Sequence, residues 1–499
     1  MKTTTMHHIL GNKVLEYDVD DRGVIVDERE IDRTVNHKPN IADWVKEHMV
    51  FWYDMSKPVD TYSQNFNDWR LHPSVNADII ITSTSFVITR FATLNDTVKC
   101  YIPDQTKNFP GMKVEVKGIV DGQELYWGYS ANVKLVNITS DGTYDIPPLE
   151  TVNGNLSFRN GNIAGACNIT ITQLPSGQSV PTNEILKANP YLQDHSGNNR
   201  PLKLNNFLFT AISGVGGYDI ASTNILPDRA NVTVTDNRII HITKKLSTTD
   251  NMVNIVPANS NPTHKFKITG LSDGRQVSLV NRNGGFYTFD NGEHEVTLTY
   301  PEGTTSLYNA IGVTGSAGDM DVTIEFIPRY PNALVTDGVD DYGVVENFKS
   351  LQNYMMFFQC AITKPNTTNG MFSTTSTESN TRGWMLLQGS SAYYVRFGNN
   401  VYKNFNVTSS IGGKISYVLS ANNELMTCYV GEEKATLAGT YKQTGANMSL
   451  FLSDNNNKTR FGSMAFYKSI LFDSVPTKQN DGFTEQDLID YVLENLITK

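Results

Sequence analysis

The chain of 499 residues is poor in charge and in cysteine, and it contains no long apolar run. Charged residues make up 18% of it, below the roughly 25% of an average soluble domain. Aromatic residues reach 10%. Disordered chains are poor in aromatics, and long coiled coils need dense Glu, Lys and Ala, so the composition excludes both classes. The net charge is −10 and no basic block occurs, which argues against binding to nucleic acid.

The sequence also lacks a signal for membrane insertion or export. The longest apolar runs, such as residues 79–81 and 354–358, are far short of the roughly 20 residues that span a bilayer. The first eight residues have no apolar stretch of the signal-peptide kind. We therefore expect neither membrane insertion nor export.

The four cysteines, Cys100, Cys167, Cys360 and Cys428, are widely spaced and form no C-x-x-C pair. This excludes the usual zinc and thioredoxin-like patterns. We expect reduced, half-buried thiols. The alternative is that Cys100 pairs with Cys167, or Cys360 with Cys428, if neighbouring strands bring them together.

Most of the chain is typical of β-strands. Apolar and polar residues alternate over 232–235, 294–299 and 321–326, which places one face of each strand in a core. Asp-Gly and Asn-Gly pairs, which favour tight hairpins, separate such stretches. These pairs stand at 121–122, 141–142, 273–274, 283–284 and 291–292.

Helical signals are few. A short helix is predicted within 41–52, and a second within 183–192, where Pro190 should end it. The clearest is C-terminal: Thr484 can cap it, and Leu488, Val492 and Leu496 recur at helical spacing. This apolar stripe should pack on the last sheet.

An internal duplication is the most informative feature of the sequence. When Ala77 is aligned with Ala230, apolar positions, turn glycines and prolines coincide over about a hundred residues with only small adjustments. The matches include Ile79 with Val232, Ile81 with Val234, Val87 with Ile240, Asp121-Gly122 with Asp273-Gly274, Asp141-Gly142 with Asn291-Gly292, and Pro175 with Pro328. Any two β-rich stretches share the alternation of apolar and polar residues, but matched turn residues and prolines are not expected by chance. The pattern therefore predicts two copies of one β-sandwich module.

Three phrases outside the repeats are familiar: residues 194–198 (Asp-His-Ser-Gly-Asn), 337–342 (Asp-Gly-Val-Asp-Asp-Tyr), and 466–472 leading into 483–489. In that order, after an opening strand at 51–54, they resemble a laminin-G-like (concanavalin A-like) jelly roll. The wording at 189–194 and 204–207 is similar to that of virion proteins of gut-bacterial tailed phages, including crAss-like ones. The resemblance implies attachment, fibre or capsid-decoration roles in a virion that is assembled in the cytoplasm of a bacterial host.

Together these features predict an all-β fold: a discontinuous concanavalin A-like jelly roll with two inserted homologous β-sandwich modules and a C-terminal helix. We expect the jelly roll to comprise 49–75, 182–228 and 330–499, and the modules to occupy 76–181 and 229–329. Residues 1–48 are unusually charged and are interpreted as an arm that docks on a partner subunit, with a flexible tail as the alternative. The expected partners are other virion proteins and a host-surface glycan. The chain is also expected to form a homo-oligomer, a trimer.

Catalysis needs a specific constellation, and none is found. The acidic run 27–30 lacks the E-x-D-x-E spacing of a jelly-roll glycosidase, and His294-Glu295 lacks the second His of H-E-x-x-H. No G-x-S-x-G elbow or Walker A loop occurs. We therefore predict a non-enzymatic virion protein without a cofactor, a fibre, appendage or decoration subunit. The alternative is a carbohydrate-binding protein or glycan hydrolase that uses the jelly-roll face.

Two weaker site signals are retained. Clustered carboxylates at 337–341 could hold calcium, although an Asp-Gly turn before a strand explains them better, so no metal is expected. Trp384, Tyr393 and Tyr394 are candidate glycan contacts, because sugar sites use exposed aromatic rings. Trp384 leads into an apolar stretch and core packing is favoured for it, whereas Tyr393 and Tyr394 must point to opposite faces of a strand.

Overall fold

A computed structural model describes most of the chain. The residues outside its description are 1–3, 11–12, 20–24, 32–39, 63–65, 67–69, 72–76, 83, 92–99, 102–108, 131, 151–155, 164, 210–212, 218–219, 236–237, 258–262, 273, 282–284, 299–308, 349–350, 352, 365–368, 376–381, 389–392, 398–400, 406–413, 423–424, 431–432, 439–446, 455–458 and 499.

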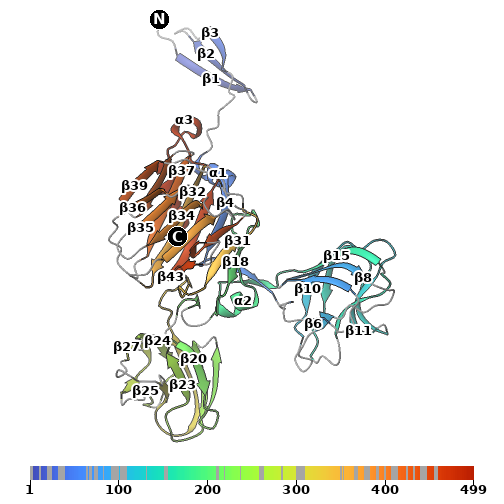
Figure 1. The fold of residues 1–499 in the computed structure, drawn as a ribbon, viewed down its shortest axis with the longest axis vertical. Coiled ribbons are helices and arrows are strands. Elements are labelled where there is room, and N and C mark those ends of the chain that lie inside the picture. The colour runs from blue at the N-terminus through green and yellow to red at the C-terminus, as the bar shows by residue number, and fades with distance from the viewer. Residues whose placement is uncertain are drawn as a thin grey trace.

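The central body is a jelly roll of two eight-stranded antiparallel sheets (Figure 1). The first has the order β17 (Tyr191–Leu192), β18 (Leu202–Asn205), β31 (Tyr342–Val345), β40 (Met448–Leu450), β33 (Asn369–Thr375), β34 (Arg382–Gln388), β35 (Tyr393–Phe397) and β36 (Val401–Phe405). The second has the order β19 (Gly214–Val215), β30 (Leu334–Val335), β43 (Met464–Phe472), β32 (Asn353–Ile362), β37 (Ile415–Asn422), β38 (Leu425–Val430) and β39 (Glu433–Ala438), with β4 (Met49–Asp54) also paired to β43. A short hairpin joins β41 (Leu452–Asp454) to β42 (Thr459–Phe461).

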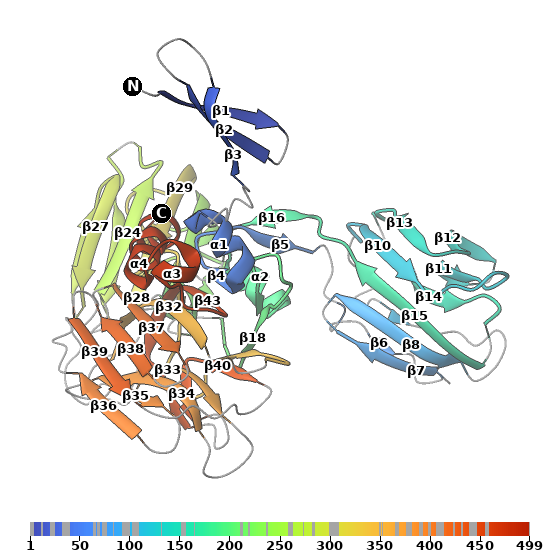
Figure 2. The ribbon, with the colours of Figure 1, turned by 90° about the horizontal axis from the view of Figure 1, so that it is seen from above.

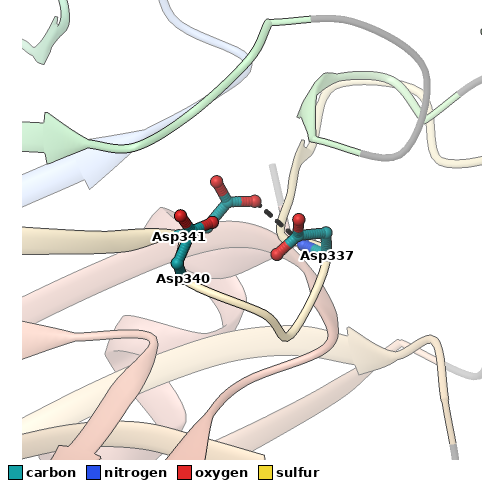
Figure 3. A group of neighbouring side chains, drawn as sticks. All are labelled: Asp337, Asp340 and Asp341. Carbon is teal, nitrogen blue, oxygen red and sulfur yellow. Dashed lines mark hydrogen bonds between the residues drawn. The ribbon is translucent and has the colours of Figure 1, made fainter. Parts of the chain in front are cut away.

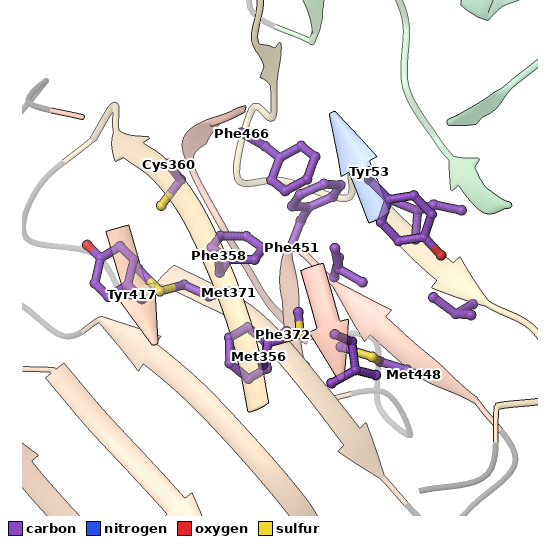
Figure 4. Close-up of a cluster of buried hydrophobic side chains, with 14 of the residues drawn as sticks. Tyr53, Met356, Phe358, Cys360, Met371, Phe372, Tyr417, Met448, Phe451 and Phe466 are labelled. Atoms are coloured by element: carbon purple, nitrogen blue, oxygen red, sulfur yellow. The ribbon is translucent and has the colours of Figure 1, made fainter. Parts of the chain in front are cut away.

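The core of the jelly roll lies between these sheets and is rich in aromatic and sulfur-containing side chains (Figure 4). Phe372 from one sheet and Phe358 and Phe466 from the other are completely buried or nearly so. The rings of Phe358 and Phe466 have centroids 5.2 Å apart. Burial of such rings, at roughly 25 cal/mol per Å² of apolar surface, is the main term that stabilises this body.

Three distant parts of the chain build this one body. The Asp194 carboxylate Oδ1 accepts the backbone N–H of Trp52 at 2.9 Å, and the Tyr53 hydroxyl donates to the Arg200 carbonyl at 2.6 Å. Strand β31, which begins at Tyr342, pairs with both β18 and β40. The predicted fold class, a discontinuous jelly roll with two inserted sandwiches and a C-terminal helix, is confirmed.

Helices cover the outer face of the second sheet. They are α1 (Ile41–His48), α3 (Lys478–Asp481), α4 (Glu485–Val492) and a π-helical turn, η2 (Leu493–Ile497). Trp44 of α1 and Leu488 of α4 are buried against Ile470 and Phe472 of β43. Thr484 caps α4, as predicted, and also forms a reciprocal capping box with Asp487.

The two short helices predicted within 41–52 and 183–192 are both present. The first ends at His48, where the chain turns directly into β4, and α2 (Asn183–Ala188) ends two residues before Pro190. Because α1 packs on the jelly roll, this body begins earlier than the expected boundary at residue 49. Within the described part of the chain, no helix has the length and apolar character needed to cross a membrane.

The two inserted modules have the same strand order. Each begins before its expected boundary at residue 76 or 229, because residues 70–71 and 220–225 form strands of the module sheets. In the first, one sheet runs β13 (Gly142–Ile146), β10 (Met112–Lys117), β15 (Gly165–Gln173), β8 (Ser85–Phe91) and β7 (Ala77–Ile81), and the other runs β12 (Val133–Ile138), β11 (Leu125–Ser130), β14 (Ser157–Asn160), β9 (Cys100–Tyr101) and β6 (Arg70–Leu71). In the second, the corresponding sheets run β27 (Gly292–Thr297), β24 (Thr263–Thr269), β29 (Gly318–Phe326), β22 (Ile239–Lys245) and β21 (Ala230–Thr235), and β26 (Phe286–Phe289), β25 (Val277–Asn281), β28 (Asn309–Val313), β23 (Val253–Pro257) and β20 (Ile220–Ile225).

The correspondence extends to single hydrogen bonds. In the first module Asp141 accepts the N–H of Ile119 at 2.7 Å, and in the second Asn291 accepts that of Leu271 at 2.9 Å. The preceding glycine, Gly118 or Gly270, has a positive φ, and an added Cβ would come within 2 Å of a backbone oxygen of the neighbouring strand. Only glycine fits such a position, so both copies retain it.

The charged N-terminal segment contains a separate three-stranded antiparallel sheet, which the sequence pattern did not reveal. It consists of β1 (Thr4–Leu10), β2 (Lys13–Val19) and β3 (Ile25–Ile31). Figures 1 and 2 show this sheet standing apart from the jelly roll and from both modules, which project in different directions.

Candidate functional sites at the module necks

Each module joins the jelly roll through a neck in which the incoming and outgoing chains pair. The first neck is a ribbon of β5 (Val59–Thr61) and β16 (Gly177–Ser179), with Thr61 opposite Gly177. The second neck is formed by β19 and β30, and its ladder continues outward where the N–H of Tyr330 donates to the Gly216 carbonyl at 2.9 Å. Because β30 also pairs with β43, this second neck is part of a jelly-roll sheet.

A cleft of about 460 Å³ lies at the first neck. Its walls come from the neck, from the turn between β7 and β8, and from the jelly-roll segment around α2 and β17. Asp60 lines the cleft and is held by two hydrogen bonds: its N–H donates to Gln193 Oε1 at 2.9 Å, and its Oδ1 accepts from Gln178 Nε2 at 3.1 Å. These residues come from distant parts of the chain, so no local sequence signal marked them as a site.

A second cleft, of about 510 Å³, lies at the second neck and has a different chemistry. Thr263, Lys265, Glu295 and Arg329 line it together with His264. The His264 side chain is buried, and its Nε2 has no hydrogen-bond partner in the described part of the chain. Burial lowers the pKa of this imidazole to about 4, so the ring is neutral at physiological pH.

The acidic turn that suggested calcium is built around Asp341 (Figure 3). Carboxylate oxygens of Asp337, Asp340 and Asp341 lie within 4.8 Å of one another. Asp341 is buried, however, and its oxygens already accept from the Ser213 hydroxyl at 3.0 Å and from the Asp337 N–H at 2.9 Å. Asp337 in turn accepts the Val339 N–H at 2.7 Å. The hydrogen bonds of Asp341 therefore tie the start of β31 to the loop before β19, and that of Asp337 holds the turn between them.

The predicted glycan contacts lie on two neighbouring strands. Trp384 is in β34, and Tyr393 and Tyr394 are in β35, where Tyr394 is opposite Leu387 and Tyr393 opposite Gln388. The side chains of all three lie outside the described residues.

The described cysteines are free thiols, which excludes the pairing of Cys360 with Cys428. These two residues lie on β32 and β38, which are separated by β37. Burial raises the pKa of both thiols far above the ordinary value, so neither is a nucleophile at neutral pH. Cys167 is also free, and the side chain of Cys100 lies outside the described residues.

Comparison of the sequence with protein-family models and with curated proteins gave no match. Among solved structures, the chain is similar to the CBM40 of Ruminococcus gnavus IT-sialidase bound to α2,3-sialyllactose, with 12% identity over 26% of this chain and 80% of that one, at a TM-score of 0.24. It is similar to domain 4 of the extracellular arabinanase AbnA from Geobacillus stearothermophilus, with 16% identity over 31% and 75% of the two chains, at 0.24. Sheep galectin-11 matches with 6% identity over 26% and 95%, at 0.21.

Proposed function

We propose that this chain is a non-enzymatic structural protein of a bacteriophage virion, a fibre, appendage or decoration subunit that mediates assembly or host-surface attachment. The observation that carries the proposal is the display architecture: two sibling sandwiches held away from one jelly roll by paired necks (Figures 1 and 2). Such an arrangement increases the surface area exposed for contacts with other molecules, which suits a binding or assembly role.

The N-terminal sheet supports docking on a partner. Three strands of seven residues each fall below the roughly 40 residues under which a folded unit usually needs a disulfide, a metal or a partner chain to be stable. Its two outer strands, β1 and β3, also present sheet edges that another chain can pair with. We propose that this sheet is completed by other virion proteins or by further copies of the chain in a homo-oligomer, with a trimer as the expected state.

Electron microscopy of the phage particles, with the chain marked by a specific antibody, tests the proposal. We expect labelling on the exterior of assembled particles. A variant lacking residues 1–39 should keep the jelly roll and modules folded, as measured by circular dichroism, but should not be incorporated. Detection of the chain only in the host lysate would contradict the virion assignment.

The second candidate is a carbohydrate-binding protein or glycan hydrolase that uses the jelly-roll face. It is favoured by the adjacent positions of β34 and β35, which bring the strands of Trp384 and Tyr394 together. Sugar release by the purified chain, abolished by replacing a single carboxylate, would displace the structural proposal.

A further inference from the structure

We infer that the cleft at the first neck is a binding site for a neutral oligosaccharide. This inference rests on the attachment role proposed above and specifies its ligand class. The site differs from the strands β34 and β35, which contain Trp384, Tyr393 and Tyr394, because it lies where the first module meets the jelly roll.

The shape of the cleft fits a small saccharide. Its volume of about 460 Å³ falls within the roughly 300–1,000 Å³ of small-molecule sites. A smaller cavity of about 200 Å³ shares Asp60, Tyr62, Thr84, Ile185 and Asn189 with it, so the space extends along α2. The site is therefore elongated, as a chain of two or more sugar rings requires.

The charge of the cleft selects against acidic sugars. Among the described residues that line it there is no lysine, arginine or histidine, whereas the carboxylates of Asp60 and Asp194 are present. A uronic or sialic acid would bring a like charge into this site with no cation to compensate it. The cleft at the second neck, by contrast, contains Lys265 and Arg329.

The remaining lining suits sugar hydroxyls and C–H faces. Tyr62 and Tyr191 are both half-buried and line the cleft. Rings of this kind stack on the apolar faces of hexoses. Polar side chains line the cleft from both bodies, Gln193 from the jelly roll and Thr82 and Thr84 from the module. A bound saccharide would thus contact both bodies at once.

The experiment uses the full-length chain on an array of neutral and acidic oligosaccharides, followed by calorimetry with a neutral oligosaccharide that binds. Replacing Tyr62 by alanine should weaken binding about tenfold, because a stacking ring is lost. Asp60→Asn keeps an oxygen that can accept from Gln178 but removes the charge, and should weaken binding several-fold. Tyr287→Ala removes a half-buried tyrosine from the second module and should leave binding unchanged.

Three outcomes would overturn the inference: no neutral oligosaccharide binds, only acidic ones bind, or Tyr62→Ala binds as the parent chain does. Hydrogen exchange of β5 and β16 in each variant distinguishes lost binding from an unfolded neck. Particles that carry Tyr62→Ala should still contain the chain on their exterior. Failure of the sugar site is therefore separable from failure of the virion assignment.

Discussion

Low pH should destabilise the second module more than the first, because the second contains the buried imidazole of His264. His264 lies on the core side of β24, where its ring meets Phe326 edge-on with centroids 5.6 Å apart. The charged neighbours at this end of the module are Lys265, Glu295 and Arg329, but the lowered pKa of His264 comes from burial. Protonation would place a charge in a site that offers Nε2 no acceptor among the described residues.

The size of the effect follows from the two pKa values. A free histidine titrates at 6.5 and the folded one at about 4, and each pKa unit corresponds to about 1.4 kcal/mol. Because the folded pKa is depressed, the module has its full stability above pH 6.5. It loses up to about 3 kcal/mol as the pH falls from 6.5 to 4.

The sibling module provides a matched control. In the alignment of the two copies, the position of His264 in β24 corresponds to Met112 in β10, and each lies opposite an apolar residue, Val296 or Ile146. His264→Met should therefore fit the core and remove the acid sensitivity. The measurement is native-state hydrogen exchange of β24 and β29 between pH 7.5 and 4.5, corrected for the intrinsic exchange rate. The reasoning is refuted if the two modules lose protection equally, or if His264→Met leaves the pH dependence unchanged.

Three further predictions concern folding and ion binding. Gly270→Ala should destabilise the second module by more than about 2 kcal/mol in hydrogen exchange, because the new Cβ would overlap the Asp321 carbonyl. Gly122→Ala, with a positive φ but open space around it, should cost only about 1 kcal/mol. Calcium or a chelator should leave the melting temperature unchanged, because the oxygens of Asp341 are already hydrogen-bonded; a calcium-dependent rise of several degrees would contradict this. Thr484→Ala should destabilise α4 by about 1 kcal/mol, seen as faster exchange of its first turn, and equal exchange rates would count against the capping box.

The repeats and the discontinuous jelly roll were predictable from the sequence because their signals are local. Asp141 and Asn291 precede glycines at matched positions, and the same turn requirement acts on both copies. The capped C-terminal helix was predictable for the same reason. In contrast, the N-terminal strands carry many charged residues, such as those at 27–30, and so lack the apolar alternation by which a strand is recognised.

The clefts at the necks could not be predicted. Asp60 and Gln193 are separated by 133 residues, and only the pairing of the neck and the docking of α2 bring them within hydrogen-bond distance. His264 gave no signal either, because a histidine that alternates with Thr263 and Lys265 has the pattern of any strand. Its burial depends on tertiary packing within the second module, where it contacts Phe326.

The different construction of the two necks has a mechanical consequence. A pull on the second module is transmitted through β30 directly into β43, a central strand of the jelly roll, so that module should behave as a stiff extension of the main body. The first module is joined by a ribbon of only three residue pairs that belongs to neither large sheet, so it should rotate relative to the jelly roll under load. The second module would then keep its orientation, while the first could reorient to fit an uneven surface.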